Sequence, residues 1–130
     1  MLVASCFSYG QAFKIIVNQQ NASSGSISKK EVSDLFLKKK TKWADGTTVA
    51  PVDLNANSKI REDFSQQIHG KGISAIRNFW QQAAFSGTAS APPEKNSDAE
   101  VIEFVQKNPG AIGYVSASTK PEGVKIISIN

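Results

Sequence analysis

Residues 97–116, SDAEVIEFVQKNPGAIGYVS, change from a helical to a strand-like pattern within one short stretch. Ser97 and Glu100 form a capping box, in which the serine hydroxyl and the glutamate carboxylate each satisfy a free backbone N–H at a helix start. Apolar residues then recur at helical spacing, at Val101, Ile102 and Val105. Pro109 ends the helix, and the apolar run 111–116 is typical of a buried strand. A helix followed directly by a buried strand predicts an α/β fold.

Three further helices are predicted upstream, over residues 28–38, 57–70 and 74–86. The first begins with a second capping box, and the N-cap of the next is Asn57 or Ser58. Each has an apolar stripe, formed by Val32, Leu35 and Phe36, by Ile60, Phe64 and Ile68, and by Ile76, Phe79, Trp80 and Ala83.

Apolar, β-branched runs predict further strands at residues 13–18, 48–54 and 124–129. Pro51 indicates an edge position or a bulge in the second of these, and residues 89–96, with two prolines, are expected to form a loop. The order β-α-β-α-α-α-β-β predicts one α/β domain, with a mixed sheet of about four to five strands flanked by helices.

The composition is that of an ordinary globular chain. Its 130 residues suffice for one domain, and no apolar stretch is long enough for a membrane span. Cys6 and His69 are the only cysteine and histidine, so a zinc site, a disulfide framework and a Cys/His catalytic pair are excluded or nearly so.

The net charge of +4 is concentrated between Lys29 and Lys42, a stretch that contains six lysines and only two acidic residues, Glu31 and Asp34. A nucleic-acid surface would interleave arginines and aromatic residues. The run therefore reads as a solvated helix end, and we expect no nucleic-acid partner.

The first residues read as the end of a secretory signal peptide. In residues 1–12, Gly10 and Ala12 are small residues at positions −3 and −1 of a cleavage site, which predicts a periplasmic mature domain over 13–130. Two alternatives stay open: a lipid anchor on Cys6, and a segment that is not cleaved.

No group of residues predicts catalysis, a metal site or a cofactor. Asp53 with Glu62 and Asp63 is more economically explained as exposed acids at a helix start than as an acid/base pair. His69, beside a helix-ending glycine, has no nucleophile to activate and reads as a surface or cap residue. Ser/Asn/Gly-rich loops instead lead into two helices, at 23–28 and 55–58, where free N–H groups suit an oxyanion.

Two motifs resemble those of phosphate-binding proteins of ABC transporters. Residues 36–46, FLKKKTKWADG, resemble the F-L-G-K-x-x-x-W-x-D-G segment of that family, and residues 108–115, NPGAIGYV, resemble its x-P-G-A-I-G-Y-V strand. A strand IIVN at 15–18 precedes both in the expected order. The resemblance spans residues 13–130 and implies a single-lobe, type-II periplasmic-binding-protein-like domain, half of a two-lobed receptor, with phosphate or a similar oxyanion as ligand.

The resemblance also implies a binding site, from which this chain departs. The larger receptors have an Arg-x-Asp-Gly-Ser-Gly-Thr motif after the second strand, and residues 54–60 here read LNANSKI. Ser58 matches the serine, whereas Leu54 and Ala56 replace the arginine and the aspartate, which removes a bidentate cation and an acceptor. The implied ligand contacts are Ser58 with its adjacent N–H groups, Asn57 and Ser24, with Lys59 as a nearby charge.

Two functions remain open at this point. The first is a periplasmic oxyanion-binding domain for uptake or sensing, with an ABC transporter permease as its partner. The second is a non-catalytic interaction or accessory domain that has kept the fold and lost the ligand. Its former cleft face would dock a partner chain or a second copy of itself.

Overall fold

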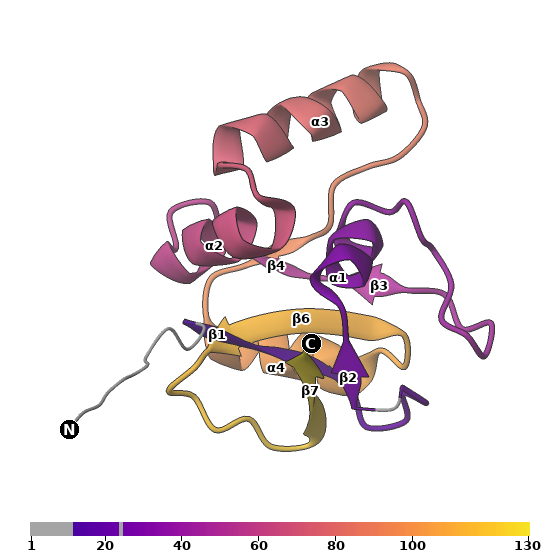
Figure 1. The fold of residues 1–130 in the computed structure, drawn as a ribbon, viewed down its shortest axis with the longest axis vertical. Coiled ribbons are helices and arrows are strands. Elements are labelled where there is room, and N and C mark those ends of the chain that lie inside the picture. The colour runs from indigo at the N-terminus through magenta and orange to yellow at the C-terminus, as the bar shows by residue number, and fades with distance from the viewer. Residues whose placement is uncertain (1–11, 24) are drawn as a thin grey trace.

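A mixed five-stranded sheet lies at the centre of the computed structural model, which describes residues 12–23 and 25–130 (Figure 1). Its strands are β1 (Phe13–Asn18), β2 (Ser26–Ile27), β3 (Ala50–Pro51), β6 (Ala111–Ser116) and β7 (Val124–Ile129). Across the sheet they run β2-β7-β1-β6-β3. The central strand β1 is antiparallel to both β6 and β7, and the two edge strands run parallel to their neighbours. The predicted α/β fold with a mixed sheet is confirmed.

The helices are α1 (Lys29–Phe36), α2 (Lys59–Phe64), its π-helical continuation η1 (Ser65–His69), α3 (Ile73–Phe85) and α4 (Asp98–Lys107). Serine side chains cap α1, α2 and α4 as predicted, since Ser28, Ser58 and Ser97 each accept a backbone N–H three residues on. The first helix ends at Phe36 and not at Lys38, because Lys38 adopts a left-handed conformation with φ of 60°.

Both faces of the sheet are covered, as β6 illustrates. A side chain on Gly113 would meet Val101 of α4, whereas Tyr114 points the other way and stacks on Phe64 of α2, with ring centroids 3.9 Å apart. Phe36 of α1 packs edge-on against Phe64 on that same face. The aromatic cluster thus attaches α1 and α2 to the sheet.

The strand predicted at 48–54 is divided in two. β3 is the edge strand beside β6, which confirms the edge position expected from Pro51, while β4 (Asp53–Leu54) pairs with β5 (Glu94–Lys95) in a separate two-stranded sheet. The loop expected at 89–96 therefore contains a strand. β2 and β5 were not predicted, because two residues carry no periodicity of their own.

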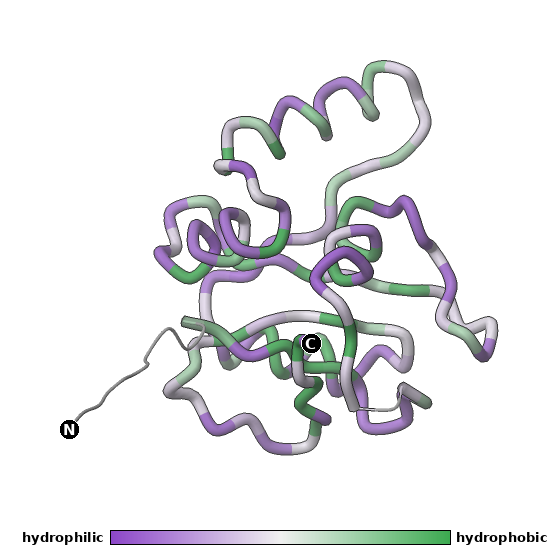
Figure 2. Tube along the Cα trace, in the orientation of Figure 1, coloured by the Kyte–Doolittle hydropathy of each residue, from purple (hydrophilic) through white to green (hydrophobic). Residues whose placement is uncertain are grey.

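Helix α3 stands away from the rest of the fold (Figure 1). Its hydrophilic and hydrophobic residues alternate along its length (Figure 2). Ile76 and Trp80 are buried, Phe79 is half-buried, and Phe85 is 96% exposed. The predicted apolar face of α3 is therefore only partly covered.

No helix within residues 12–23 and 25–130 is long and apolar enough to cross a membrane. The predicted signal peptide and the alternative anchor at Cys6 fall on residues 1–12, of which only Ala12 is among the described residues. Both stay predictions.

Candidate functional site

The loop that follows β4 is held in shape by its own asparagine. Asn55 Oδ1 accepts the backbone N–H of Asn57 at 2.9 Å, and the Asn55 carbonyl accepts that of Ser58 at 3.0 Å. The Asn55 amide also donates to Asn96 Oδ1 at 3.0 Å, which ties this loop to the chain after β5. The Asn55 side chain therefore fixes the start of α2 through two hydrogen bonds, one within the loop and one to Asn96.

Ser58 and the first residues of α2 present free hydrogen-bond donors. Ser58 Oγ accepts the Arg61 N–H at 3.2 Å, which leaves its own hydroxyl hydrogen available. In the described part of the chain, neither the Lys59 nor the Ile60 backbone N–H has an acceptor. Because α2 continues into η1, these groups lie at the positive end of a helical segment.

The other residues of the predicted site differ in how well they fit. Asn57 is exposed beside Ser58, so it is placed to contact a ligand there. The Lys59 ammonium instead lies 2.8 Å from Asp63 one turn along the helix, and this pairing raises the pKa of Lys59. An anion at Ser58 would have to compete with Asp63 for Lys59.

Ser24 lies outside the described residues. Its neighbour Ser23 lines a different cavity, of about 180 Å³, next to Trp43 and Ile27. None of Asn57, Ser58 and Lys59 lines that cavity. The two Ser/Asn-rich loops are therefore not shown to form one site.

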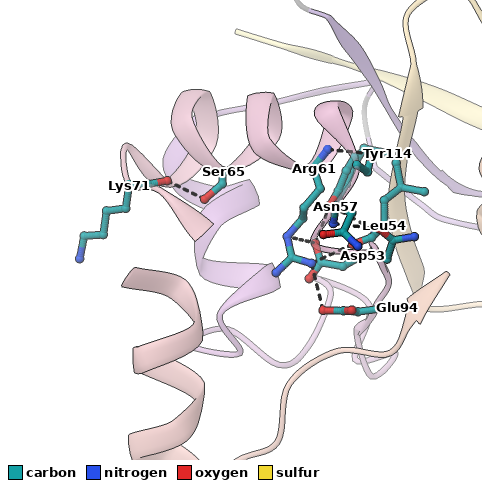
Figure 3. A network of polar contacts seen from close by, with 10 residues as sticks. Asp53, Leu54, Asn57, Arg61, Ser65, Lys71, Glu94 and Tyr114 are labelled. Atoms are coloured by element: carbon teal, nitrogen blue, oxygen red, sulfur yellow. Dashed lines mark hydrogen bonds and ion pairs between the residues drawn. The ribbon is translucent and has the colours of Figure 1, made fainter. Parts of the chain in front are cut away.

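A buried ion network lies next to the loop at residues 55–58, since it joins Leu54 before the loop to Arg61 after it (Figure 3). Arg61, 4% exposed, donates through Nη1 to the Leu54 carbonyl at 2.8 Å and to Glu94 at 3.1 Å, and its Nε lies 3.7 Å from Asp53 Oδ1. The Tyr114 hydroxyl donates to Asp53 at 2.7 Å and accepts the Leu54 N–H at 3.2 Å. The network joins β4, β5, β6 and α2 next to the site.

Burial raises the pKa of Asp53 to about 6, although Arg61 and the Tyr114 hydroxyl oppose the shift. Burial also raises the pKa of Tyr114, which stays protonated as the donor. The expectation that Asp53 is an exposed acid at a helix start is wrong, because it begins the strand β4 and is 6% exposed.

Sequence reasoning missed Arg61, and one signal would have found it. Arg61, Phe64, Ser65 and Ile68 are the buried residues of the α2–η1 segment, and they share the spacing of one helix face. Arg61 and Ser65 are polar, so a pattern of apolar residues alone predicts that the buried face begins at Ile60. Ile60 is only half-buried.

His69 lies at the helix end, as expected, but it is packed and not free at the surface. Its Nδ1 lies 2.7 Å from Ser33 Oγ, and burial lowers its pKa to about 4. Among the described residues, no group of three or more His, Cys, Asp and Glu side chains is placed to hold a metal ion.

A sequence model of the family described as PBP superfamily domain matches residues 9–127, which is most of the chain. The chain belongs to this family. Among curated proteins, no significant sequence match is found.

Solved structures share the PBP superfamily fold. An ABC-type phosphate transport receptor from Vibrio cholerae superposes with a TM-score of 0.70 at 20% identity, over 93% of this chain and 48% of its own. A putative phosphate ABC transporter substrate-binding protein with bound phosphate, from Clostridium perfringens, gives 0.69 at 19% identity, over 91% and 44%. PstS from Borrelia burgdorferi gives 0.64 at 14% identity, over 92% and 47%. This PBP domain therefore spans about half the length of the receptors it resembles.

Proposed function

We propose that this PBP domain is a non-catalytic solute-binding domain that takes phosphate or a similar oxyanion at the start of α2. The observation that carries the proposal is the set of free donors at this point: the Ser58 hydroxyl and the Lys59 and Ile60 N–H groups. Such donors stabilise an anion without a cationic side chain. The receptors of similar fold that are described as phosphate proteins support the choice of anion.

The buried Arg61 supports the same site indirectly. Its guanidinium donates to the Leu54 carbonyl, directly before the loop, and so places a cation behind a segment that lacks an arginine of its own. Its charge is offset by Asp53 and Glu94, and one face of the site is open to water. We therefore expect weak binding, with a Kd on the order of 0.1 to 1 mM.

Calorimetric titration of the protein with inorganic phosphate tests the proposal. Ser58→Ala should weaken binding about tenfold, since it removes a donor at the anion and also the cap that orders the loop. Ser97→Ala is the matched control, because it removes an equivalent cap from α4. If phosphate, arsenate and sulfate all give no saturable heat at millimolar concentration, or if both variants bind alike, the proposal is wrong.

The cellular role that follows is uptake or sensing of this anion in the periplasm, in contact with an ABC transporter permease. Secretion is tested by fractionating cells that express the protein with its own N-terminus. Recovery of the intact, uncleaved chain in the cytoplasm would contradict it.

A second candidate is an interaction domain that has kept the fold without the ligand. The exposed Phe85, at the end of a helix that is only partly covered, favours it. This candidate predicts a dimer in light scattering and no response to phosphate. A monomer that binds phosphate would exclude it.

A further inference from the structure

A second, separate cavity lies between α3 and the body of the domain, with a volume of about 220 Å³. Arg77 and Trp80 reach it from one face of α3, and Asp53, Arg61 and Glu94 reach it from β4, α2 and β5. Gln81 of α3, and Ala91 and Pro92 in the chain between α3 and β5, complete its wall. None of the residues proposed to bind phosphate lines this cavity. It is also smaller than the roughly 300 to 1,000 Å³ of pockets for drug-sized ligands, so it suits a small molecule.

Arg61 brings unused hydrogen-bonding capacity to this cavity. Its Nη1 serves the Leu54 carbonyl and Glu94, and its Nε faces Asp53. Nη2 has no acceptor among the described residues. A guanidinium has five N–H donors, and the two on Nη2 are free to donate to a carboxylate oxygen. The side chain is 5% exposed, so the position of these donors is set by packing.

Arg77 supplies a further positive charge to the cavity, and Glu94 supplies a negative charge. Arg77 is exposed and has no ion-pair partner within the part of the chain that the structure describes. Glu94 uses Oε2 for Arg61, which leaves Oε1 open, and its side chain is 44% exposed. Open donors of both arginines and an open acceptor of Glu94 therefore line the same small space, together with Asp53 and the Gln81 amide.

The charges select the class of ligand. The two arginines and the two carboxylates that line the cavity cancel, so a phosphate dianion would add uncompensated charge to a partly buried space. A molecule that carries one group of each sign matches the lining without that penalty. We propose that this cavity binds a small α-amino acid, with its carboxylate at Arg61 Nη2 and Arg77, its ammonium at Glu94, and its side chain against Trp80 and Pro92.

The test uses the two indole N–H signals of the protein in NMR titrations with glycine and L-alanine. Trp80 lines the cavity and Trp43 does not, so saturable shifts are expected at Trp80 alone. Trp43→Phe assigns the two signals. Arg77→Gln and Glu94→Gln should each weaken binding at least about tenfold. Lys120→Gln removes one positive charge, as Arg77→Gln does, but at an exposed lysine outside the cavity, and it should leave amino-acid binding unchanged.

Acetate carries only the carboxylate of an amino acid, and methylammonium carries only the ammonium group. Titrations with these two ions therefore show whether the cavity needs both groups in one ligand. Weaker binding of both than of glycine supports the proposal, whereas acetate that binds as well as glycine overturns it in favour of a plain carboxylate site. No Trp80 shift with either amino acid, or an unchanged affinity in Arg77→Gln, also overturns it. Because Arg77 lines this cavity and is not part of the proposed phosphate site, Arg77→Gln should leave phosphate binding intact, so failure of this proposal is distinguishable from failure of the phosphate site.

Discussion

The indole Nε1 of Trp43 donates a hydrogen bond to the Gly110 carbonyl at 2.9 Å, across 67 residues of chain. Trp43 belongs to the FLKKKTKWADG segment and Gly110 to NPGAIGYV, so the two motifs that carried the family resemblance contact each other. The same carbonyl also accepts the Ala50 N–H at 2.9 Å, where β3 joins the edge of β6. The two motifs therefore act as one structural unit that closes this edge of the sheet.

Trp43→Phe should lower the free energy of unfolding by about 1 kcal/mol beyond any packing loss, because it removes one hydrogen bond and leaves Ala50 to serve the carbonyl. Urea denaturation measures the change. Trp80→Phe is the control for ring size, since the Trp80 indole makes no hydrogen bond among the described residues. Equal losses in the two variants would mean that the hydrogen bond contributes nothing measurable.

Gly110→Ala should destabilise the fold by about 3 kcal/mol, because the new Cβ would lie 1.8 Å from the Thr48 carbonyl oxygen and the backbone would have to move. Gly72→Ala makes the same substitution where the nearest atom, on the Gln66 side chain, is 3.5 Å away. It should cost about 1 kcal/mol or less, as a change at a helix N-cap. Denaturation midpoints of the two variants that coincide would contradict this account.

The parts of the fold that could be predicted are those that local physics decides. Ser28 and Ser97 are predictable as caps, and Ser58 as one of two candidates beside Asn57, because a cap needs only a polar side chain and a free N–H two or three residues away. β1 and β6 are predictable because each is a six-residue segment made mostly of apolar residues. β5 exists only because β4 lies beside it, so its two residues carry no signal.

In the candidate site, the sequence predicts the residues that would contact a ligand but not the buried residues that support them. The resemblance placed Ser58 and Asn57 at the start of α2, where free donors are found. Their support depends on Arg61 meeting Glu94 across 33 residues and on Tyr114 meeting Asp53 across 61 residues. Polar pairs at such separations follow from the three-dimensional arrangement and leave no local pattern.

Tyr114→Phe should destabilise the protein by about 1 to 3 kcal/mol, because the buried Leu54 N–H loses its acceptor and Asp53 loses a donor. It should also raise the pKa of Asp53, since that hydrogen bond lowers it. Urea denaturation and a carboxyl-detected NMR titration measure the two effects. Ser86→Ala, which removes an exposed hydroxyl at the end of α3, should change the stability by about 0.5 kcal/mol or less. An unshifted Asp53 titration would show that the hydroxyl does not stabilise the carboxylate.

Two buried titratable groups should give opposite dependences of stability on pH. Asp53, with its pKa raised to about 6, binds its proton more tightly in the folded state, so its contribution to stability is lost as pH rises from about 4 to 6. His69, with its pKa lowered to about 4, binds its proton less tightly when folded, so its contribution is lost as pH falls from about 6.5 to 4. The contributions of Asp53 and His69 to the wild-type free energy of unfolding should therefore nearly cancel between about pH 4 and pH 6.

Single substitutions should separate the two contributions. Asp53→Asn should make stability rise with pH, and His69→Gln should make it fall, each by on the order of 1 to 3 kcal/mol relative to wild type across this range. Both replacements keep a hydrogen-bonding side chain, for Tyr114 in one case and Ser33 in the other. Urea denaturation at successive pH values measures the slopes. If Asp53→Asn has the wild-type slope, Asp53 titrates alike in the folded and unfolded states, and the burial of its charge has no energetic consequence in this range.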